Sequence, residues 1–91
     1  MINTILVEDD LYIQKHFIER LSEENGFRLV GVYRDAFEAE RYCDRSVQLV
    51  LMDVQTQHKH SGLAAAEHIK KVFPQIKIVV ATSLVDPEVL Q

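Results

Sequence analysis

The chain has little cysteine and no long apolar run, and each shortage excludes a class of protein. Cys43 is the only cysteine, so no disulfide can form within the chain, and no CxxC or Cys/His spacing indicates structural zinc. A reducing cytoplasm is the expected location, with Cys43 as a small apolar residue on a helix. No apolar run approaches the roughly 20 residues that a membrane helix needs. Residues 1–8 have no basic group ahead of their apolar part, so a secretory signal is not expected either.

Positive charge is also in deficit, because 14 acidic residues outnumber 10 basic ones and give a net charge of −4. Nucleic-acid binding through this domain is therefore not expected, since contact with a phosphate backbone needs a basic face. A cation site is compatible with this balance. With 47% hydrophobic and 26% charged residues, residues 1–91 suffice for one globular domain, and no repeat or linker-like stretch divides them.

Short apolar runs alternate along the chain with longer amphipathic stretches. The runs expected to form strands are residues 2–7, 27–33, 47–52 and 76–81. The stretches expected to form helices, each with one apolar side, are residues 11–24, 35–44 and 62–73. Asn25-Gly26 and Pro74 are expected to end the first and third of these helices. Asp86-Pro87 is expected to begin a further helix.

This alternation predicts an α/β fold, with a parallel sheet covered by helices on both faces. Four strands joined by right-handed crossovers fit the doubly wound, flavodoxin-like order 2-1-3-4. In that arrangement the carboxyl ends of the strands meet at one edge of the sheet. Ligands bind at this edge where the strand order reverses, which is between the first and third strands.

Polar residues follow three of the predicted strands directly. Glu8 and Asp9 follow the first strand, Asp53 follows the third, and Thr82 follows the fourth. Three carboxylates at one edge repel one another unless a cation neutralises them. Oxygen ligands of this kind suit a hard ion, Mg²⁺ or alternatively Mn²⁺, and not zinc. A carboxylate beside such an ion can attack a phosphoryl group, and the Thr82 hydroxyl could donate to the phosphate that forms.

Simpler interpretations compete with these assignments. Acids at a helix N-terminus often act only as caps, worth about 1 kcal/mol, and Asp10 is assigned that role. His58 and His60 could bind a transition metal, but no third ligand is near in sequence, and a solvated loop is the favoured interpretation. A phosphatase of the haloacid dehalogenase type needs a second Asp two residues after the strand-end Asp, where this chain has Gln55.

Four segments in this order resemble the receiver domain of two-component response regulators, the CheY-like family. They are the strand with its acids at residues 5–10, the strand with its terminal Asp at residues 49–54, the helix entry at residues 61–63, and the run from Phe73 to Ser83. The resemblance extends from about residue 3 to the end of the chain. It implies a flavodoxin-like fold and a signalling protein, not an enzyme.

By this resemblance Asp53 is the phosphoacceptor, and a histidine kinase is the phosphate donor. The implied Mg²⁺ ligands are Asp53, Asp9, the backbone carbonyl of Gln55, and Glu8 acting through water. Thr82 is the switch hydroxyl that moves toward the phosphoryl group, and the Ser83 amide helps to hold that group. DNA binding and transcription regulation are expected only of a separate output domain.

The sequence departs from the family pattern in two respects. Residues 55–62 lack the proline that usually stands four positions after the phosphoacceptor, and they contain one extra residue, which indicates a variant subfamily. The chain is also expected to be C-terminally truncated, ending early in the fourth helix without the fifth strand, the fifth helix or the family's phosphate-contacting lysine. An apolar strand at residues 76–81 would then form a sheet edge, which favours a homo-oligomer. A receiver-like interaction module that cannot be phosphorylated is the alternative function.

Overall fold

The computed structural model describes residues 1–53 and 59–81, and a parallel sheet of four strands lies at its centre. The strands are β1 (Ile2–Val7), β2 (Phe27–Tyr33), β3 (Leu49–Asp53) and β4 (Lys77–Ala81). Their order is β2-β1-β3-β4, and every neighbouring pair is parallel. The predicted α/β fold with the flavodoxin-like strand order is therefore confirmed for the described residues.

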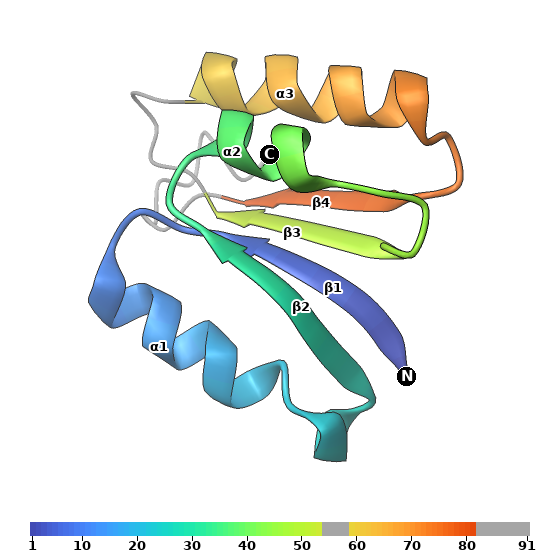
Figure 1. The fold of residues 1–91 in the computed structure, drawn as a ribbon. Helices are drawn as coiled ribbons and strands as arrows, with labels where there is room; N and C mark the ends of the chain where they lie inside the picture. The colour runs from blue at the N-terminus through green and yellow to red at the C-terminus, as the bar shows by residue number, and fades with distance from the viewer. Residues whose placement is uncertain (54–58, 82–91) are drawn as a thin grey trace.

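Helices lie on both faces of this sheet, as Figure 1 shows. The first, α1 (Leu11–Arg20), lies on one face, and α2 (Ala36–Tyr42) and α3 (Lys59–Val72) pack together on the other. The chain runs from β1 outward to β2 and then back past β1 to β3 and β4. Because crossovers between parallel strands are right-handed, this reversal separates α1 from the later helices. It also leaves the switch point of the sheet between β1 and β3.

The first helix is shorter than the predicted range of residues 11–24. It ends at Arg20, and a separate 3₁₀ turn, η1 (Glu23–Asn25), follows it. The Asn25 side-chain amide donates to the Arg20 carbonyl at 2.8 Å, which satisfies one of the carbonyls left open at the helix end. Gly26 has the predicted left-handed backbone, with φ 89°, but it closes the 3₁₀ turn instead of the α-helix.

The third helix begins earlier than predicted. It starts at Lys59, three residues before the predicted range of residues 62–73. His60 therefore belongs to this helix, whereas His58 lies outside the described residues. Residues 59–61 contain no apolar side chain, so the one-sided apolar pattern used to predict helices was absent there.

The strand boundaries follow the prediction more closely. The first two strands span the predicted residues, while β3 begins at Leu49 instead of residue 47 and β4 begins at Lys77 instead of residue 76. Val47 is buried, but its N–H donates to the Asp44 carbonyl at 3.2 Å in a turn before the strand. The helix predicted to begin at Asp86 lies outside the described residues.

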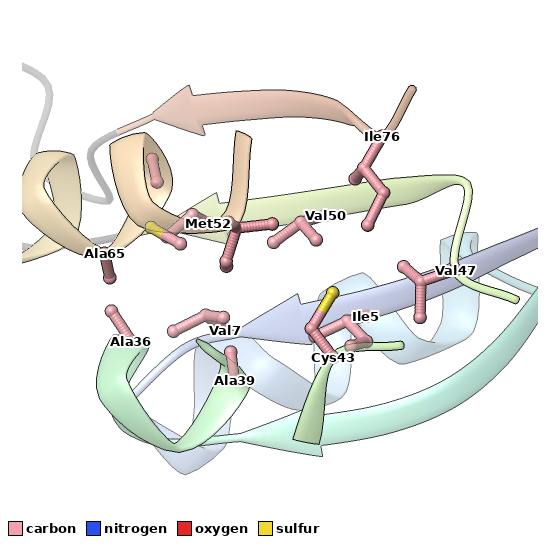
Figure 2. Close-up of a cluster of buried hydrophobic side chains, with 12 residues drawn as sticks. Ile5, Val7, Ala36, Ala39, Cys43, Val47, Val50, Met52, Ala65 and Ile76 are labelled. Atoms are coloured by element: carbon pink, nitrogen blue, oxygen red, sulfur yellow. The ribbon is translucent and has the colours of Figure 1, made fainter. Parts of the chain in front are cut away.

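The main core lies between the sheet and the layer formed by α2 and α3 (Figure 2). Large side chains from the strands meet mainly small side chains from the helices, which lets the two layers pack closely. The strand residues are Ile5, Val7, Val50 and Met52, and the helix residues are Ala36, Ala39, Ala65, Ala66 and Ile69. Cys43 follows α2 directly and is buried in this core, where desolvation raises the pKa of its thiol.

The predicted apolar side of the first helix is only partly covered. No residue of α1 is fully buried, and Leu11 is 63% exposed. Leu21, directly after the helix, is buried and anchors this end of α1. In the part of the chain that the structure describes, no helix is both long enough and apolar enough to cross a membrane.

Candidate functional site

Because β1 and β3 are neighbours in the sheet, the acids at their carboxyl ends lie close together. Val7 of β1 pairs with Met52 of β3, and each is followed directly by an acid, Glu8 and Asp53. Asp9 comes next, in the turn from β1 into α1. The three carboxyl groups are near enough for the charges of Asp53 and Asp9 to act on Glu8, and for that of Asp9 to act on Asp53. They occupy the switch point of the sheet, at the edge where the strand arrows end in Figure 1.

Two of these acids are withdrawn from water. Glu8 is 0% exposed and Asp53 is 3% exposed, while Asp9 is partly exposed. Four of their carboxylate oxygens are buried without a hydrogen-bond partner, namely Glu8 Oε1 and Oε2, Asp9 Oδ1 and Asp53 Oδ1. Buried polar atoms are normally satisfied, and leaving one unpaired costs roughly 1–3 kcal/mol. The described part of the chain therefore holds several acceptor atoms for which it supplies no donor.

The surroundings of these acids raise their pKa values. Burial raises the pKa of Glu8 from 4.5 to about 7, the charges of Asp53, Asp9 and Asp10 add to this, and a backbone N–H at Asp10 opposes it. Burial, and then the charge of Asp9, raises the pKa of Asp53 from 3.8 to about 6.

The acids fit a hard divalent cation, which would favour their ionised forms and give the unpartnered oxygens a ligand. Within residues 1–53 and 59–81, no group of three or more His, Cys, Asp or Glu side chains is placed to hold a metal ion. Mg²⁺ needs only one or two protein carboxylates, because it keeps several waters. The other predicted contacts, the Gln55 carbonyl, Thr82 and Ser83, lie outside the described residues.

Asp10 has a different role from the acids before it. Its Oδ1 accepts hydrogen bonds from the backbone N–H groups of Tyr12 at 2.8 Å and Ile13 at 3.1 Å. Asp10 is therefore the N-cap of α1, and its predicted role as a cap is confirmed. The cap also fixes where the helix begins, directly after the turn that carries Glu8 and Asp9.

Two long side chains that the sequence did not identify support this turn. The Gln14 amide donates to the Glu8 carbonyl at 3.1 Å, and the Arg34 Nε donates to the Asp9 carbonyl at 3.3 Å. The backbone N–H of Glu8 also donates to the Tyr33 carbonyl at 2.9 Å. Arg34 is 25 residues from Asp9 in the chain, so no local sequence pattern could have linked them.

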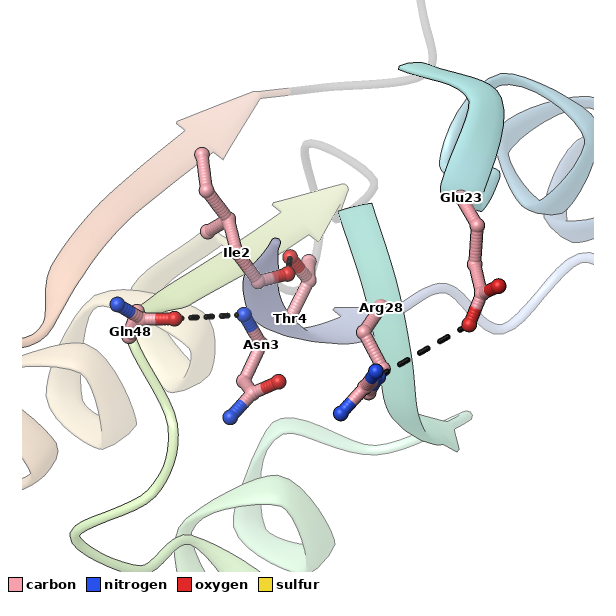
Figure 3. Close-up of polar contacts among 6 residues, drawn as sticks. All are labelled: Ile2, Asn3, Thr4, Glu23, Arg28 and Gln48. Atoms are coloured by element: carbon pink, nitrogen blue, oxygen red, sulfur yellow. Dashed lines mark hydrogen bonds and ion pairs between the residues drawn. The ribbon is translucent and has the colours of Figure 1, made fainter. Parts of the chain in front are cut away.

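The amino ends of the strands, at the opposite end of the sheet from the acids, have ordinary structural contacts. Figure 3 shows the Asn3 N–H donating to Gln48 Oε1 at 2.9 Å and the ion pair of Arg28 with Glu23 at 3.9 Å. A groove of about 430 Å³ lies between α3 and β4, and none of the three acids lines it. Among the described residues, buried carboxylate oxygens without a partner occur only at the carboxyl edge.

Comparison with known proteins assigns a family to this arrangement. The family model described as "Response regulator receiver domain" matches residues 4–91. Among curated relatives, the oxygen regulatory protein NreC from Staphylococcus aureus is 28% identical over 87 residues. The match covers 94% of this chain and 40% of NreC, so the chain spans less than half the length of that relative.

Solved structures share the fold. The signal receiver domain of a modulated diguanylate cyclase from Desulfovibrio desulfuricans G20 matches with a TM-score of 0.76 and 23% identity, over 100% of this chain and 72% of that one. A chain of the CheX–CheY–BeF3–Mg²⁺ complex from Borrelia burgdorferi matches with a TM-score of 0.74 and 18% identity, over 97% and 66% of the two chains. The MaeR response regulator bound to beryllium trifluoride matches with a TM-score of 0.64 and 20% identity, over 99% and 74%. Because the family model matches residues 4–91, nearly the whole of this chain, the chain belongs to the family of response regulator receiver domains.

Proposed function

We propose that this chain is the phosphoacceptor domain of a two-component response regulator and that Asp53 accepts the phosphoryl group with Mg²⁺ bound beside it. The observation that carries the proposal is the pair of buried carboxylates at the switch point of the sheet: both oxygens of Glu8 and the Oδ1 of Asp53 lack partners among the described residues. Membership of the receiver family supports it, because the family's phosphoacceptor is an Asp at the end of the third strand, where Asp53 lies.

In the proposed reaction, a carboxylate oxygen of Asp53 attacks the phosphorus atom of a phosphohistidine on the kinase. A P–O bond to Asp53 forms, the P–N bond to the histidine breaks, and the electron pair leaves with the imidazole. A small acyl phosphate would react in the same way, with a P–O bond breaking and a carboxylate leaving. Asp9 would bind Mg²⁺ directly and Glu8 through water. Bound Mg²⁺ would offset the negative charge on the phosphoryl oxygens.

Three further contacts belong to the proposal and lie outside the described residues. The Gln55 backbone carbonyl would complete the metal ligands, the Thr82 hydroxyl would move toward the transferred group, and the Ser83 amide would help to hold it. The proposal is for Mg²⁺, the ion named in the Borrelia burgdorferi complex. None of the proteins compared above supports Mn²⁺.

The proposed phosphate donor is a histidine kinase. NreC is named as a regulatory protein, and more than half of its length lies outside the match, which supports a regulator whose output domain lies elsewhere in the protein. DNA binding and transcription regulation are proposed for such a domain and not for this one, and the cytoplasmic location stays a prediction.

Self-association through the edge of β4 also stays a prediction. Within the described residues β4 pairs on one side only, with β3, and an open apolar edge can pair with a second chain. Light scattering at high protein concentration measures this directly, and the mass of a monomer would count against it.

Phosphorylation by acetyl phosphate, followed by intact-mass spectrometry, tests the proposed function. The chain should gain the mass of one phosphoryl group in the presence of Mg²⁺ and none in EDTA. Asp53→Asn should gain none under either condition. Asp44→Asn is the matched control, because Asp44 is an exposed aspartate in the connection between α2 and β3, and this variant should be modified like the wild type.

Each other outcome points to a different conclusion. If the wild type stays folded by circular dichroism and gains no phosphoryl group with Mg²⁺, the acids are structural remnants. A receiver-like interaction module that is not phosphorylated would then replace the proposal. If Asp53→Asn is still modified, Asp53 is not the phosphoacceptor.

A further inference from the structure

Arg34 lies at the same edge of the sheet as the acids, directly after β2. Its Nε donates a hydrogen bond to the backbone carbonyl of Asp9 at 3.3 Å. The residue before it, Tyr33, accepts a hydrogen bond from the backbone N–H of Glu8 at 2.9 Å. The end of β2 therefore holds the acid-bearing turn at two consecutive residues, Glu8 through the backbone and Asp9 through a side chain.

The contact made by Arg34 is to a carbonyl, although the turn carries carboxylates. In the part of the chain that the structure describes, both ion pairs lie elsewhere, one between η1 and β2 and the other between α2 and α3. The guanidinium thus fixes the backbone of Asp9 and leaves the carboxylate unneutralised. The buried Oδ1 of Asp9 keeps its lone pairs free for a cation.

We propose that Arg34 is a positioning residue for the phosphoacceptor site: by fixing the Asp9 backbone, it directs the Asp9 carboxylate toward Asp53 and so strengthens Mg²⁺ binding. This inference rests on the proposed function. A positive charge near the site acts in the opposite direction, because it repels a cation. Replacing Arg34 therefore weakens Mg²⁺ binding if its hydrogen bond matters, and strengthens it if only its charge matters.

Two substitutions and a matched control separate these effects. Arg34→Met removes the donor and the charge but keeps a long apolar stem, whereas Arg34→Lys keeps a charge and a donor. Arg28→Met is the control, because Arg28 is another exposed arginine but lies near the start of β2, at the opposite end of the strand from Arg34 and beside Glu23 (Figure 3). Titration with Mg²⁺, followed by calorimetry or by NMR shifts, gives the dissociation constant of each protein.

Arg34→Met should raise the Mg²⁺ dissociation constant about two- to fivefold, as the loss of one partly exposed hydrogen bond allows. Arg34→Lys should recover most of this loss, and Arg28→Met should bind like the wild type. At saturating Mg²⁺, Arg34→Met should react with acetyl phosphate at about the wild-type rate, because a positioning residue acts through the metal site and not on the phosphorus. Unchanged or tighter Mg²⁺ binding by Arg34→Met would overturn the inference, as would equal weakening in Arg28→Met.

A second measurement keeps this inference separate from the proposed function. If the wild type does not bind Mg²⁺, the proposed function fails, and amide hydrogen exchange in EDTA decides the role of Arg34. The Glu8 amide, which donates to Tyr33, should exchange faster in Arg34→Met than in the wild type or Arg28→Met. Equal exchange in the three proteins would show that Arg34 does not hold the turn.

Discussion

Replacing Asp53 by Asn is expected to stabilise the metal-free chain at neutral and alkaline pH. Asp53 is 3% exposed, its Oδ1 has no partner among the described residues, and burial raises its pKa from 3.8 to about 6. Ionising this carboxyl group is therefore harder in the folded chain than in the unfolded chain. An amide has nearly the same shape and does not ionise. The substitution also removes one of the charges that raise the pKa of Glu8.

The pH dependence follows from the direction of the two shifts. Folding raises the pKa of Glu8 from 4.5 to about 7 and that of Asp53 from 3.8 to about 6, so the folded chain binds protons more tightly. At a pH at or below their unfolded pKa values, these two groups do not lower the free energy of unfolding. As the pH rises from the unfolded pKa values to about 7, the free energy of unfolding falls, because both groups ionise less readily in the folded chain.

The magnitude is bounded by the size of the shift. One pKa unit corresponds to about 1.4 kcal/mol, so the shift at Asp53 sets a ceiling of about 3 kcal/mol. Relaxation of the fold around the buried charge reduces this value, so we expect Asp53→Asn to gain about 1–2 kcal/mol at about pH 8 in EDTA. Near pH 4, where the folded wild type carries a protonated Asp53, the gain should be close to zero.

Urea unfolding followed by circular dichroism, between about pH 4 and 8 in EDTA, measures this gain. Glu24→Gln is the control, because it removes one negative charge from an exposed position of η1 and should change the free energy of unfolding little. Added Mg²⁺ should stabilise the wild type more than Asp53→Asn, since only the wild type keeps all three carboxylates. The reasoning is refuted if Asp53→Asn is no more stable than the wild type at about pH 8, or if Glu24→Gln gains as much.

Three further substitutions test the scaffold around the site, each by its effect on the free energy of unfolding in urea. Asp10→Ala should lower it by about 1 kcal/mol, because it removes the cap of α1, while Asp10→Ser should stay near the wild type. Gly31→Ala should lower the free energy of unfolding by about 1–3 kcal/mol, because the added Cβ would lie 2.7 Å from Cε2 of Tyr33. This loss should be smaller in a chain that also carries Tyr33→Ala, and an equal loss there would contradict the clash. Ile69→Ala should lower it by about 2–5 kcal/mol, whereas Val72→Ala, at a 67% exposed position of the same helix, should change it by less than about 0.5 kcal/mol.

The strands were predictable because each is a short apolar run that can be recognised from its own residues. The first two strands match the predicted residues, and the order of all four follows from alternation and crossover handedness. Helix ends were less predictable, because they depend on single hydrogen bonds that leave no trace in the apolar pattern. The first helix ends at Arg20, whose carbonyl accepts a hydrogen bond from the Asn25 side chain. The apolar pattern does not distinguish Arg20 from the four residues that follow it. The register shift between Thr4 and Ile5, where β1 pairs with β2, was also not predictable from the apolar pattern.

The candidate site was predictable to the extent that topology determines it. The carboxyl ends of parallel strands lie at one end of the sheet, so the sequence pattern alone predicts that Glu8, Asp9 and Asp53 lie together. The support of the turn by Gln14 and Arg34 was not predictable, because both are long polar side chains on exposed or half-exposed positions, and such residues occur throughout the chain. Their contacts depend on where β2 and α1 end in space.

Asp10 and Asp53 show what the structure adds to a list of acids. Both follow an apolar strand closely, and the sequence assigns Asp10 to the cap of the first helix and Asp53 to a site at the strand end. In the structure, Asp10 accepts two backbone N–H groups, so its charge stabilises the start of α1. Asp53 is more deeply buried, and its Oδ1 accepts no hydrogen bond from the residues that the structure describes. A buried carboxylate oxygen without a partner among the described residues is not explained by folding alone, whereas a bound cation would give it one. The distinction lies in the satisfied hydrogen bonds of one acid and the missing ones of the other.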